Sequence, residues 1–221
     1  PMRRQRRIAE RETASRGLAL RPPEILDERL HIDKELLLIM NAAGFLFQTP
    51  RLLLRPFVSE DAPALHEILG DRETMAYCEP PYTLEQTRRF LADFCIKRQG
   101  ALAAVRKDDG LLTGYILFKP IDKDVYEIGW IFRRDCWRQG YAYEACSGVI
   151  DRAFRVLGAH KLLAETIDPG KSVPLMEKLG MLPEGIQRSQ VRDLSGNWAD
   201  LYLYGILSED WKRHGIKMDL S

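Results

Sequence analysis

Long apolar runs are missing from this chain of 221 residues. A helix needs roughly 18 consecutive apolar residues to cross a bilayer, whereas the run at residues 36–40 has only five and follows Asp33, Lys34 and Glu35. The basic start of the chain is not followed by the apolar stretch of a signal peptide. We therefore expect a cytoplasmic protein without a membrane partner.

Cysteine and histidine are also scarce, with four of each. No two cysteines form a Cys-x-x-Cys pair and the histidines are scattered, so neither a disulfide framework nor a metal site is indicated. Neither sign of charge predominates, because the formal net charge is only +1. This argues against an attraction of the whole chain to nucleic acid or membranes. The 45% of hydrophobic residues is enough to form the core of a soluble protein.

The first 48 residues differ in composition from the rest. Six arginines face two glutamates up to Arg16, an excess of four positive charges. Such an arm can contact a ribosome or RNA, but a solvated, partly helical tail is the simpler interpretation. Apolar side chains within residues 24–40 are spaced for a short helix packed on the main domain. We therefore divide the chain into a basic, partly helical extension at residues 1–48, one domain at 49–214 and a tail at 215–221.

Strand and helix patterns alternate along the expected domain. Apolar runs rich in β-branched and aromatic residues predict strands at residues 52–57, 101–105, 111–118, 125–132, 161–167, 187–192 and 199–207. Helical spacing of apolar residues predicts helices at 59–69, 83–98, 141–157 and 172–179. Ser59 is the expected cap of the first helix, and Thr83 and Gln86 form a capping-box pattern for the second. The alternation indicates an α/β (α+β) fold, a mixed sheet with helices on both faces.

Residues 137–145, which read Trp-Arg-Gln-Gly-Tyr-Ala-Tyr-Glu-Ala, join a predicted strand to a predicted helix. The backbone N–H groups of such a loop and the dipole of the following helix attract anions. Gly140 and Ala142 would let a pyrophosphate approach the backbone closely. An ordinary strand-to-helix connection explains the same residues, so other segments must decide between the two interpretations.

The loop resembles the acetyl-coenzyme A loop of the GNAT acetyltransferase superfamily, in particular its RimJ/RimL-like branch of ribosomal-protein N-terminal acetyltransferases. Arg138 replaces a glycine of that branch. Residues 51–57, 126–130, 172–180 and 193–200 resemble other family segments in the family's order. The resemblance implies a mostly antiparallel GNAT-like sheet with acetyl-CoA as co-substrate. It assigns cofactor contacts to Trp137, Arg138, Gln139, Gly140, Tyr141 and Ala142.

The strand before the loop is expected to supply the hydrogen-bond donor for the carbonyl group that reacts. A thioester carbonyl needs a hydrogen-bond donor as it becomes an oxyanion, and the family supplies the donor from the backbone of a bulged strand. Gly129 interrupts an aromatic and β-branched run, which marks a bulge, a close approach or a glycine kept for packing. By resemblance, main-chain groups of Trp130, Ile131 and Phe132 would line the pantetheine.

Two side chains are the main candidates for catalytic proton transfer. Glu127 lies two residues before Gly129 and so projects to the same face, where a carboxylate can take the proton of the attacking amine. A structural ion pair with an arginine is its other interpretation, and Asp193 and Asp200 are alternative bases. Ser172 matches the serine that part of the branch uses at the departing thiolate, although a helix N-cap would also explain it.

Three departures from the family pattern bear on activity. Arg138 adds charge at the phosphates, points to solvent, or strains the backbone where the family has glycine. Met176 stands where many superfamily members have a tyrosine. Residues 168–171, Asp-Pro-Gly-Lys, replace a family asparagine that precedes the serine by three positions.

The prediction is an N-acetyltransferase that moves acetyl from acetyl-CoA to a primary amine by direct attack, without a metal or a covalent enzyme intermediate. The acceptor is a protein N-terminus or a small molecule, and residues 77–82 and 189–198 are expected to shape its pocket. The rival is a non-catalytic GNAT-fold module that binds an acyl-CoA or a partner protein, with ribosome or RNA contact through the arginine-rich arm. A monomer and a homodimer are both compatible with the sequence.

Overall fold

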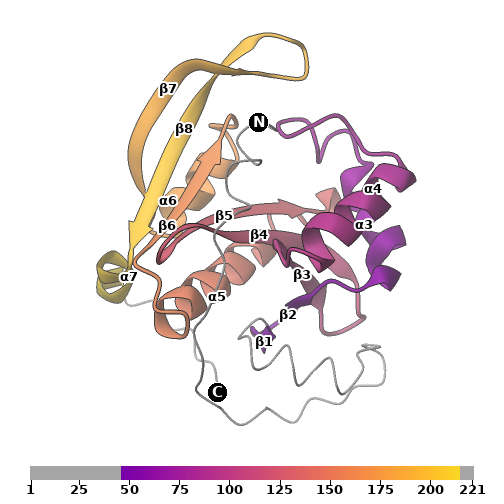
Figure 1. The fold of residues 1–221 in the computed structure, drawn as a ribbon, viewed down its shortest axis with the longest axis horizontal. Coiled ribbons are helices and arrows are strands. Elements are labelled where there is room, and N and C mark those ends of the chain that lie inside the picture. Colours follow the sequence, from indigo (N-terminus) through magenta and orange to yellow (C-terminus); the bar gives the residue numbers. More distant parts are fainter. Residues whose placement is uncertain (1–45, 215–221) are drawn as a thin grey trace.

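An eight-stranded sheet lies at the centre of the molecule in the computed structural model, which describes residues 46–214 (Figure 1). The strands are β1 (Phe47–Gln48), β2 (Leu52–Pro56), β3 (Ala101–Arg106), β4 (Leu112–Asp122), β5 (Val125–Phe132), β6 (Lys161–Thr166), β7 (Leu182–Arg192) and β8 (Trp198–Leu207). Their order is β1-β2-β3-β4-β5-β6-β8-β7, and every neighbouring pair except β5 and β6 is antiparallel. The predicted mostly antiparallel mixed sheet is confirmed.

The parallel pair of β5 and β6 is short. Residues Val125–Glu127 pair with Lys161–Leu163, and no further pair joins the two strands. β5 continues to Phe132 and stays paired with β4 over its whole length, whereas β6 continues to Thr166 beside β8. The two strands therefore diverge after Glu127, and the sheet splits at its centre.

Helices cover both faces of the sheet, as predicted. One face carries α5 (Tyr141–Arg155), α6 (Ser172–Lys178) and α7 (Ser208–His214), and the other carries α3 (Ala62–Leu69) and α4 (Leu84–Phe90), which continues as a π-helical turn, Leu91–Ile96. The two faces have separate cores because successive side chains of a strand alternate between faces. On β5, Ile128 and Phe132 pack in the core under α5, and Ile131 packs against the core under α3.

The capping box at the start of α4 confirms the sequence pattern, and the expected cap at Ser59 is wrong. Gln86 N–H donates to Thr83 Oγ1 at 3.2 Å, and Thr83 N–H donates to Gln86 Oε1 at 2.7 Å. Ser59 instead begins a 3-10 turn, Ser59–Asp61, and its hydroxyl donates to Glu60. Asp61 is held by Arg55 through two hydrogen bonds of 2.7 Å, so the chain turns at this buried ion pair before α3 begins.

The ends of the described chain bear on the expected domain limits. β1 pairs with β2 and the side chain of Leu46 is buried, so residues 46–48 pack with the domain that was expected to start at 49. Predictions for residues 1–45 and for the tail at 215–221 lie outside the described residues. Within residues 46–214, no helix has the length and apolar character required to cross a membrane.

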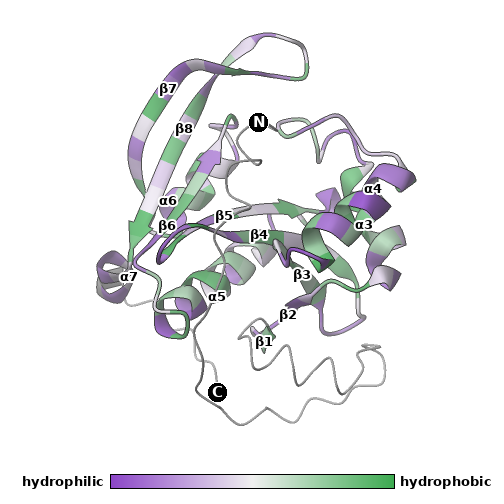
Figure 2. Ribbon diagram, viewed as in Figure 1, coloured by the Kyte–Doolittle hydropathy of each residue, from purple (hydrophilic) through white to green (hydrophobic). Residues whose placement is uncertain are grey.

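β7 and β8 form a long hairpin that extends beyond the helices (Figure 1). Most of β7 is exposed, while β8 becomes buried toward its end at residues 204–206. Figure 2 shows hydrophobic and hydrophilic residues mixed along this hairpin. Leu182, Ile186 and Trp198 are among its exposed apolar side chains. The hairpin therefore resembles a projecting arm whose base alone belongs to the core.

Candidate functional site

The split between β5 and β6 leaves main-chain groups of β5 without a strand partner on one side. Arg133 N–H donates to the carbonyl of Thr113 on the β4 side at 2.9 Å. Because the direction of N–H groups alternates along a strand, those of Ile131 and Gly129 also face β4. The N–H groups of Trp130 and Phe132 face the side from which β6 has diverged. A ligand lying in the split can therefore reach Trp130 and Phe132, while the main chain of Ile131 belongs to the ladder.

Gly129 shows no bulge within this ladder. It pairs with Leu117 in the regular register, and the irregularity between β4 and β5 lies near Pro120 instead. A Cβ at Gly129 would meet only Leu117, with Cβ at 3.6 Å and Cδ2 at 4.0 Å, which are ordinary contacts. Of the three interpretations of this glycine, the bulge is therefore wrong, and the exposed main chain arises from the divergence of β5 and β6.

The loop after β5 leads to an open helix N-terminus. Gly140 is the N-cap of α5 with φ 83°, and a glycine has no side chain to accept the first helical N–H groups. Within residues 46–214, the N–H groups of Gly140, Tyr141 and Ala142 have no protein acceptor. The dipole of a 15-residue helix adds positive potential at the same point. These groups fit the pyrophosphate of the expected co-substrate.

Gly140 is required by its backbone conformation and by its surroundings. Its positive φ is strained for any residue with a Cβ, and a Cβ built there would lie 3.3 Å from Arg51 Nη2. The guanidinium of Arg51 also lies over the ring of Tyr141, 4.3 Å from its centroid. The glycine therefore keeps the backbone accessible at the mouth of the helix.

Arg51 and Glu144 fix the start of α5 against β2, a role that the sequence patterns did not reveal. Glu144 accepts from Arg51 Nε at 2.6 Å, from Arg51 N–H at 2.7 Å and from the Thr49 hydroxyl at 2.6 Å. Arg51 Nη1 also donates to the carbonyl of Gln139 at 2.9 Å. Glu144 is nearly buried, so this network holds the loop in place from inside. Both residues lie in motif segments, but only the fold brings them together.

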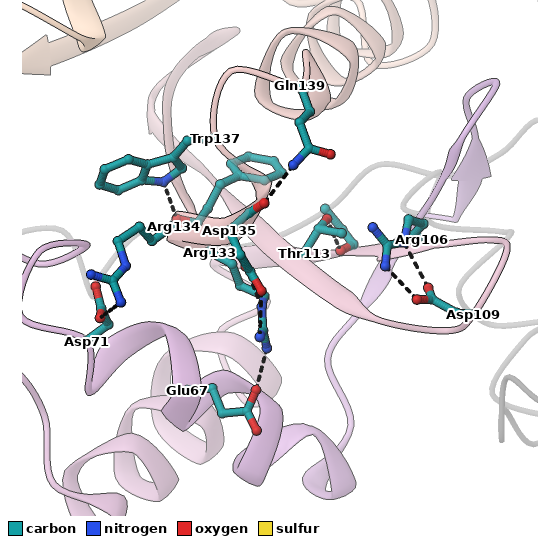
Figure 3. Close-up of polar contacts among 12 residues, drawn as sticks. Glu67, Asp71, Arg106, Asp109, Thr113, Arg133, Arg134, Asp135, Trp137 and Gln139 are labelled. Carbon is teal, nitrogen blue, oxygen red and sulfur yellow. Dashed lines mark hydrogen bonds and ion pairs between the residues drawn. The ribbon is translucent and has the colours of Figure 1, made fainter.

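Trp137 and Gln139 shape the loop through their side chains. Trp137 Nε1 donates to the carbonyl of Phe132 at 2.7 Å, and Gln139 Nε2 donates to the carbonyl of Asp135 at 2.6 Å (Figure 3). Both residues were expected to contact the cofactor through the loop they belong to. In the structure their side chains close this loop on the end of β5 and on itself.

Two arginines connect this loop to α3 and the segment after it (Figure 3). Arg133 binds Asp135 through two hydrogen bonds, at 3.0 and 3.1 Å, and forms an ion pair with Glu67 of α3. Arg134 lies 3.2 Å from Glu73 and 3.8 Å from Asp71. The hydrogen bonds from Arg133 lower the pKa of Asp135, which favours its charged, paired form. The start of the cofactor loop is thus tied by charge to α3 and to the residues that directly follow it.

Arg138 occupies a left-handed conformation with φ 59°. This explains why the related branch has glycine at the position, because an L-residue with a Cβ pays about 1–2 kcal/mol there. Within the described residues, its guanidinium has no hydrogen-bond or carboxylate partner. The strain predicted for this substitution is therefore present, and no contact of the arginine side chain with the described residues offsets it.

Arg138→Gly is expected to raise the free energy of unfolding by up to about 1 kcal/mol, since relief of strain exceeds the added flexibility of the unfolded chain. Denaturant unfolding measures this change, and Arg138→Lys, which keeps both Cβ and charge, should leave stability unchanged. A destabilised glycine variant would show that the arginine side chain holds the loop. The dissociation constant of acetyl-CoA for the same variants reports any contact between Arg138 and phosphate.

Ser172 begins α6, but it does not cap it. Asp168 instead closes the turn before the helix, because Oδ1 accepts from the N–H groups of Gly170 at 3.0 Å and Lys171 at 3.1 Å, and α6 has no side-chain cap. This gives the Asp-Pro-Gly-Lys departure from the family a structural function. The half-buried hydroxyl of Ser172 has no hydrogen-bond partner within residues 46–214. It therefore stays available to a ligand.

Glu127 forms an ion pair, though with a lysine rather than an arginine. Its Oε2 lies 3.0 Å from Lys119 Nζ, the residue opposite it on β4. Both side chains are partly exposed, and Glu127 occupies the last position at which β5 pairs with β6. The carboxylate thus lies on the edge of the split, on the face that also carries Ile131.

The remaining candidates have structural roles. Asp193 accepts from the N–H groups of Ser195 at 2.9 Å and Asn197 at 2.8 Å, which closes the turn of the β7–β8 hairpin. Asp200 accepts from Ser189 N–H at 2.7 Å within the same hairpin. Met176 is buried in the core under α5, so it cannot take the place of a tyrosine at the reacting sulfur. Two side-chain candidates are left, Glu127 at the edge of the split and Ser172 at the start of α6.

Comparisons with known proteins agree with this geometry. The family model for the acetyltransferase (GNAT) domain matches residues 51–182. The uncharacterized N-acetyltransferase YnaD of Bacillus subtilis is 32% identical over 169 residues, which cover 74% of this chain and 97% of that protein. A crystal structure of a GNAT-family acetyltransferase from Bacillus anthracis has a TM-score of 0.69 at 30% identity, covering 74% of this chain and 99% of the other. The spermidine N-acetyltransferase of Vibrio cholerae, solved with CoA and spermine, shares the fold, with a TM-score of 0.65, 21% identity and coverage of 73% and 98%.

Proposed function

The chain belongs to the acetyltransferase (GNAT) family and is an acyltransferase with acetyl-CoA as co-substrate, and we propose that it acetylates a primary amine by direct attack. Acetyl-CoA supplies an activated thioester. The nitrogen lone pair of the amine forms the new bond to the carbonyl carbon, and the carbon–sulfur bond breaks. The amine loses a proton and the thiolate gains one, so no metal, redox partner or covalent enzyme intermediate is needed.

The open helix N-terminus at Gly140 carries this proposal. Its unpaired N–H groups would hold the pyrophosphate, and β5, the strand that leads to this helix, is not paired with β6 after Glu127. The N–H of Trp130 faces this split and is the candidate donor to the oxyanion. The main chain of Phe132 offers a second N–H, while its carbonyl is taken by Trp137. The anion site and the split together suit acetyl-CoA, a long thioester that carries its phosphates at one end and its reactive group at the other.

The acceptor would approach from the segment after α3. Lys171 Nζ lies 5.6 Å from the ring centroid of Tyr77, so Tyr77, the first residue of the 77–82 segment, lies beside the residue that precedes α6. Tyr77 is half exposed, and the Tyr82 hydroxyl donates to Glu79 at 2.6 Å. A small amine and a protein N-terminus both remain in the proposal, the first supported by the Vibrio cholerae relative and the second by the resemblance to the RimJ/RimL-like branch.

Calorimetric titration with acetyl-CoA, followed by an acetyl-transfer screen over small amines and N-terminal peptides, tests the proposal. We expect a single site and release of free thiol with one acceptor class. Binding without transfer to any acceptor would favour the non-catalytic acyl-CoA-binding module. No binding at all would refute both interpretations.

Glu127→Gln is expected to slow acetyl transfer. A general base accepts the proton of the attacking amine, and an amide in the place of the carboxylate cannot do so. The rate near neutral pH should fall by about 10²-fold or more if the proton passes through this group. Lys119→Met is the matched control, because it breaks the same ion pair but leaves the carboxylate. Equal effects of the two variants would mean that the ion pair, and not proton transfer, matters.

A further inference from the structure

The ammonium of Lys171 contacts two aromatic rings that belong to different parts of the site. Its Nζ lies 4.3 Å from the ring centroid of Trp137 in the cofactor loop and 5.6 Å from that of Tyr77, which follows α3. Lys171 itself lies in the connection between β6 and α6. A cation within about 6 Å of a ring centroid is attracted to the face of the ring. One side chain therefore joins the segment after α3, the loop after β5 and the connection after β6.

Tyr77 begins a stretch that is exposed between two fixed points. Met75 before it is buried, and the ring centroid of Tyr82 after it lies 6.0 Å from that of Phe90 in α4. All residues from 77 to 81 are exposed, and Tyr77 itself is half exposed. A contact to Tyr77 from another part of the site therefore helps to fix the position of this stretch.

The backbone and the charge of Lys171 both suit it for this contact. Its N–H donates to Asp168 Oδ1 at 3.1 Å, which fixes the turn from which the side chain extends. Within residues 46–214 the ammonium forms no ion pair with a carboxylate, so its charge is available to the two rings. Residues 168–171 depart from the family pattern. The bridge therefore belongs to the part of the site in which this chain differs from the family.

We propose that Lys171 is a positioning residue, whose ammonium holds Tyr77 and the exposed stretch after it beside the cofactor loop as one wall of the acceptor site. The role in acceptor binding rests on the proposed function, whereas the bridge itself rests on the two contacts of the ammonium. Without the bridge, the stretch occupies its working position for a smaller fraction of the time, and the apparent affinity for the acceptor falls in proportion. The expected pyrophosphate site at Gly140 does not include Lys171, so the affinity for CoA should stay unchanged.

Amide hydrogen exchange measures the bridge without any acceptor. The N–H of Cys78 donates to the carbonyl of Met75 at 2.9 Å, so its exchange requires local opening of the stretch. Lys171→Met should speed up this exchange roughly 5-fold, the order of one lost cation–π contact, and Lys171→Arg should restore the protection. Lys178→Met is the matched control, because Lys178 in α6 also lies over a ring, 4.5 Å from the centroid of Tyr143, and this pair does not involve the stretch. It should leave the exchange at Cys78 at the wild-type rate.

A double-mutant cycle assigns the effect to the ring of Tyr77. Tyr77→Phe keeps an aromatic face and should exchange like the wild type, whereas Tyr77→Leu should behave like Lys171→Met. Because either change breaks the same link, the double variant should exchange no faster than Lys171→Met alone. Wild-type exchange in Lys171→Met, or additive effects in the double variant, would overturn the bridge.

Steady-state kinetics with spermidine and with a peptide that has a free N-terminus, one probe for each acceptor class, test the role in acceptor binding. Lys171→Met should raise the KM of the acceptor about 5-fold, with kcat and the dissociation constant of CoA unchanged. Weaker binding of CoA in calorimetric titration would show that the ammonium pairs with the co-substrate and would overturn the positioning role. A wild-type protein that binds CoA but acetylates neither probe would contradict the proposed function, while the exchange rates alone would still decide whether the bridge exists.

Discussion

Gly140→Trp is expected to abolish binding of acetyl-CoA while the protein stays folded. The indole would fill the space in front of the N–H groups of Tyr141 and Ala142, so two or three charge-assisted hydrogen bonds to the pyrophosphate would be lost. At about 1.5–3 kcal/mol each, their loss weakens binding by roughly 10²–10⁴-fold or more. Calorimetric titration measures the affinity, and circular dichroism measures the fold.

The control for this variant must also place a side chain at a glycine with positive φ, so that both variants carry the same backbone strain. Gly110 in the turn between β3 and β4 also has positive φ, 74°, and no atom lies within 4 Å of a Cβ built there. Gly110→Trp should therefore lose similar stability, of the order of 1–2 kcal/mol, and keep wild-type affinity. A folded Gly140→Trp variant that still binds acetyl-CoA would show that the pyrophosphate does not lie at this helix.

The elements that sequence patterns predicted are those fixed by local rules. β5 was placed at residues 125–132, as observed, because alternation of apolar residues is a property of the strand itself. The capping box at Thr83 was predictable for the same reason, since its two hydrogen bonds join residues three positions apart. Ser59 does not cap α3 because Asp61, which Arg55 holds in a buried ion pair, occupies the N-cap position instead.

The parts of the site that escaped prediction depend on contacts between distant segments. Glu144 meets Thr49 and Arg51 across more than 90 residues, and no spacing rule links them. Gln139 fits the family pattern, yet only the folded loop shows that its amide serves the carbonyl of Asp135. The open main chain of Trp130 follows from where β6 stops pairing, a feature of the sheet rather than of one strand. Gly129 alone could not reveal this feature, since a bulge, a close approach and a packing glycine all fitted the sequence.

The conformation of Arg138 could be predicted from sequence in part. Comparison with the glycine of the related branch predicted a strained backbone, and the φ of 59° confirms it. Such a strained backbone persists only when the contacts around the loop stabilise this conformation by more than the strain costs. Arg51, Glu144, Trp137 and Gln139 supply that rigidity. A loop held this firmly can present its N–H groups without reorganising when an anion binds, which is what a preorganised phosphate site needs.

Ser172→Ala is expected to lower kcat by about 10²-fold, with little change in the affinity for acetyl-CoA. A hydroxyl donates usefully only to the thiolate that develops as the carbon–sulfur bond breaks, so the contact exists mainly in the transition state. Steady-state kinetics should therefore show kcat and kcat/KM falling together.

A role of Ser172 as the cap of α6 leads to a different expected result for the same variant. If the serine were a plain cap, its removal would cost about 1 kcal/mol of stability and leave turnover intact. Ser172 is the first residue of α6 and no side chain caps this helix, so stability should change by less than this. Ser208→Ala, at the first residue of α7, is the matched control for losing a hydroxyl at the start of a helix. Should Ser172→Ala turn over at the wild-type rate, the thiolate must depart without help from α6, and catalysis would rest on the positioned thioester and the N–H of Trp130.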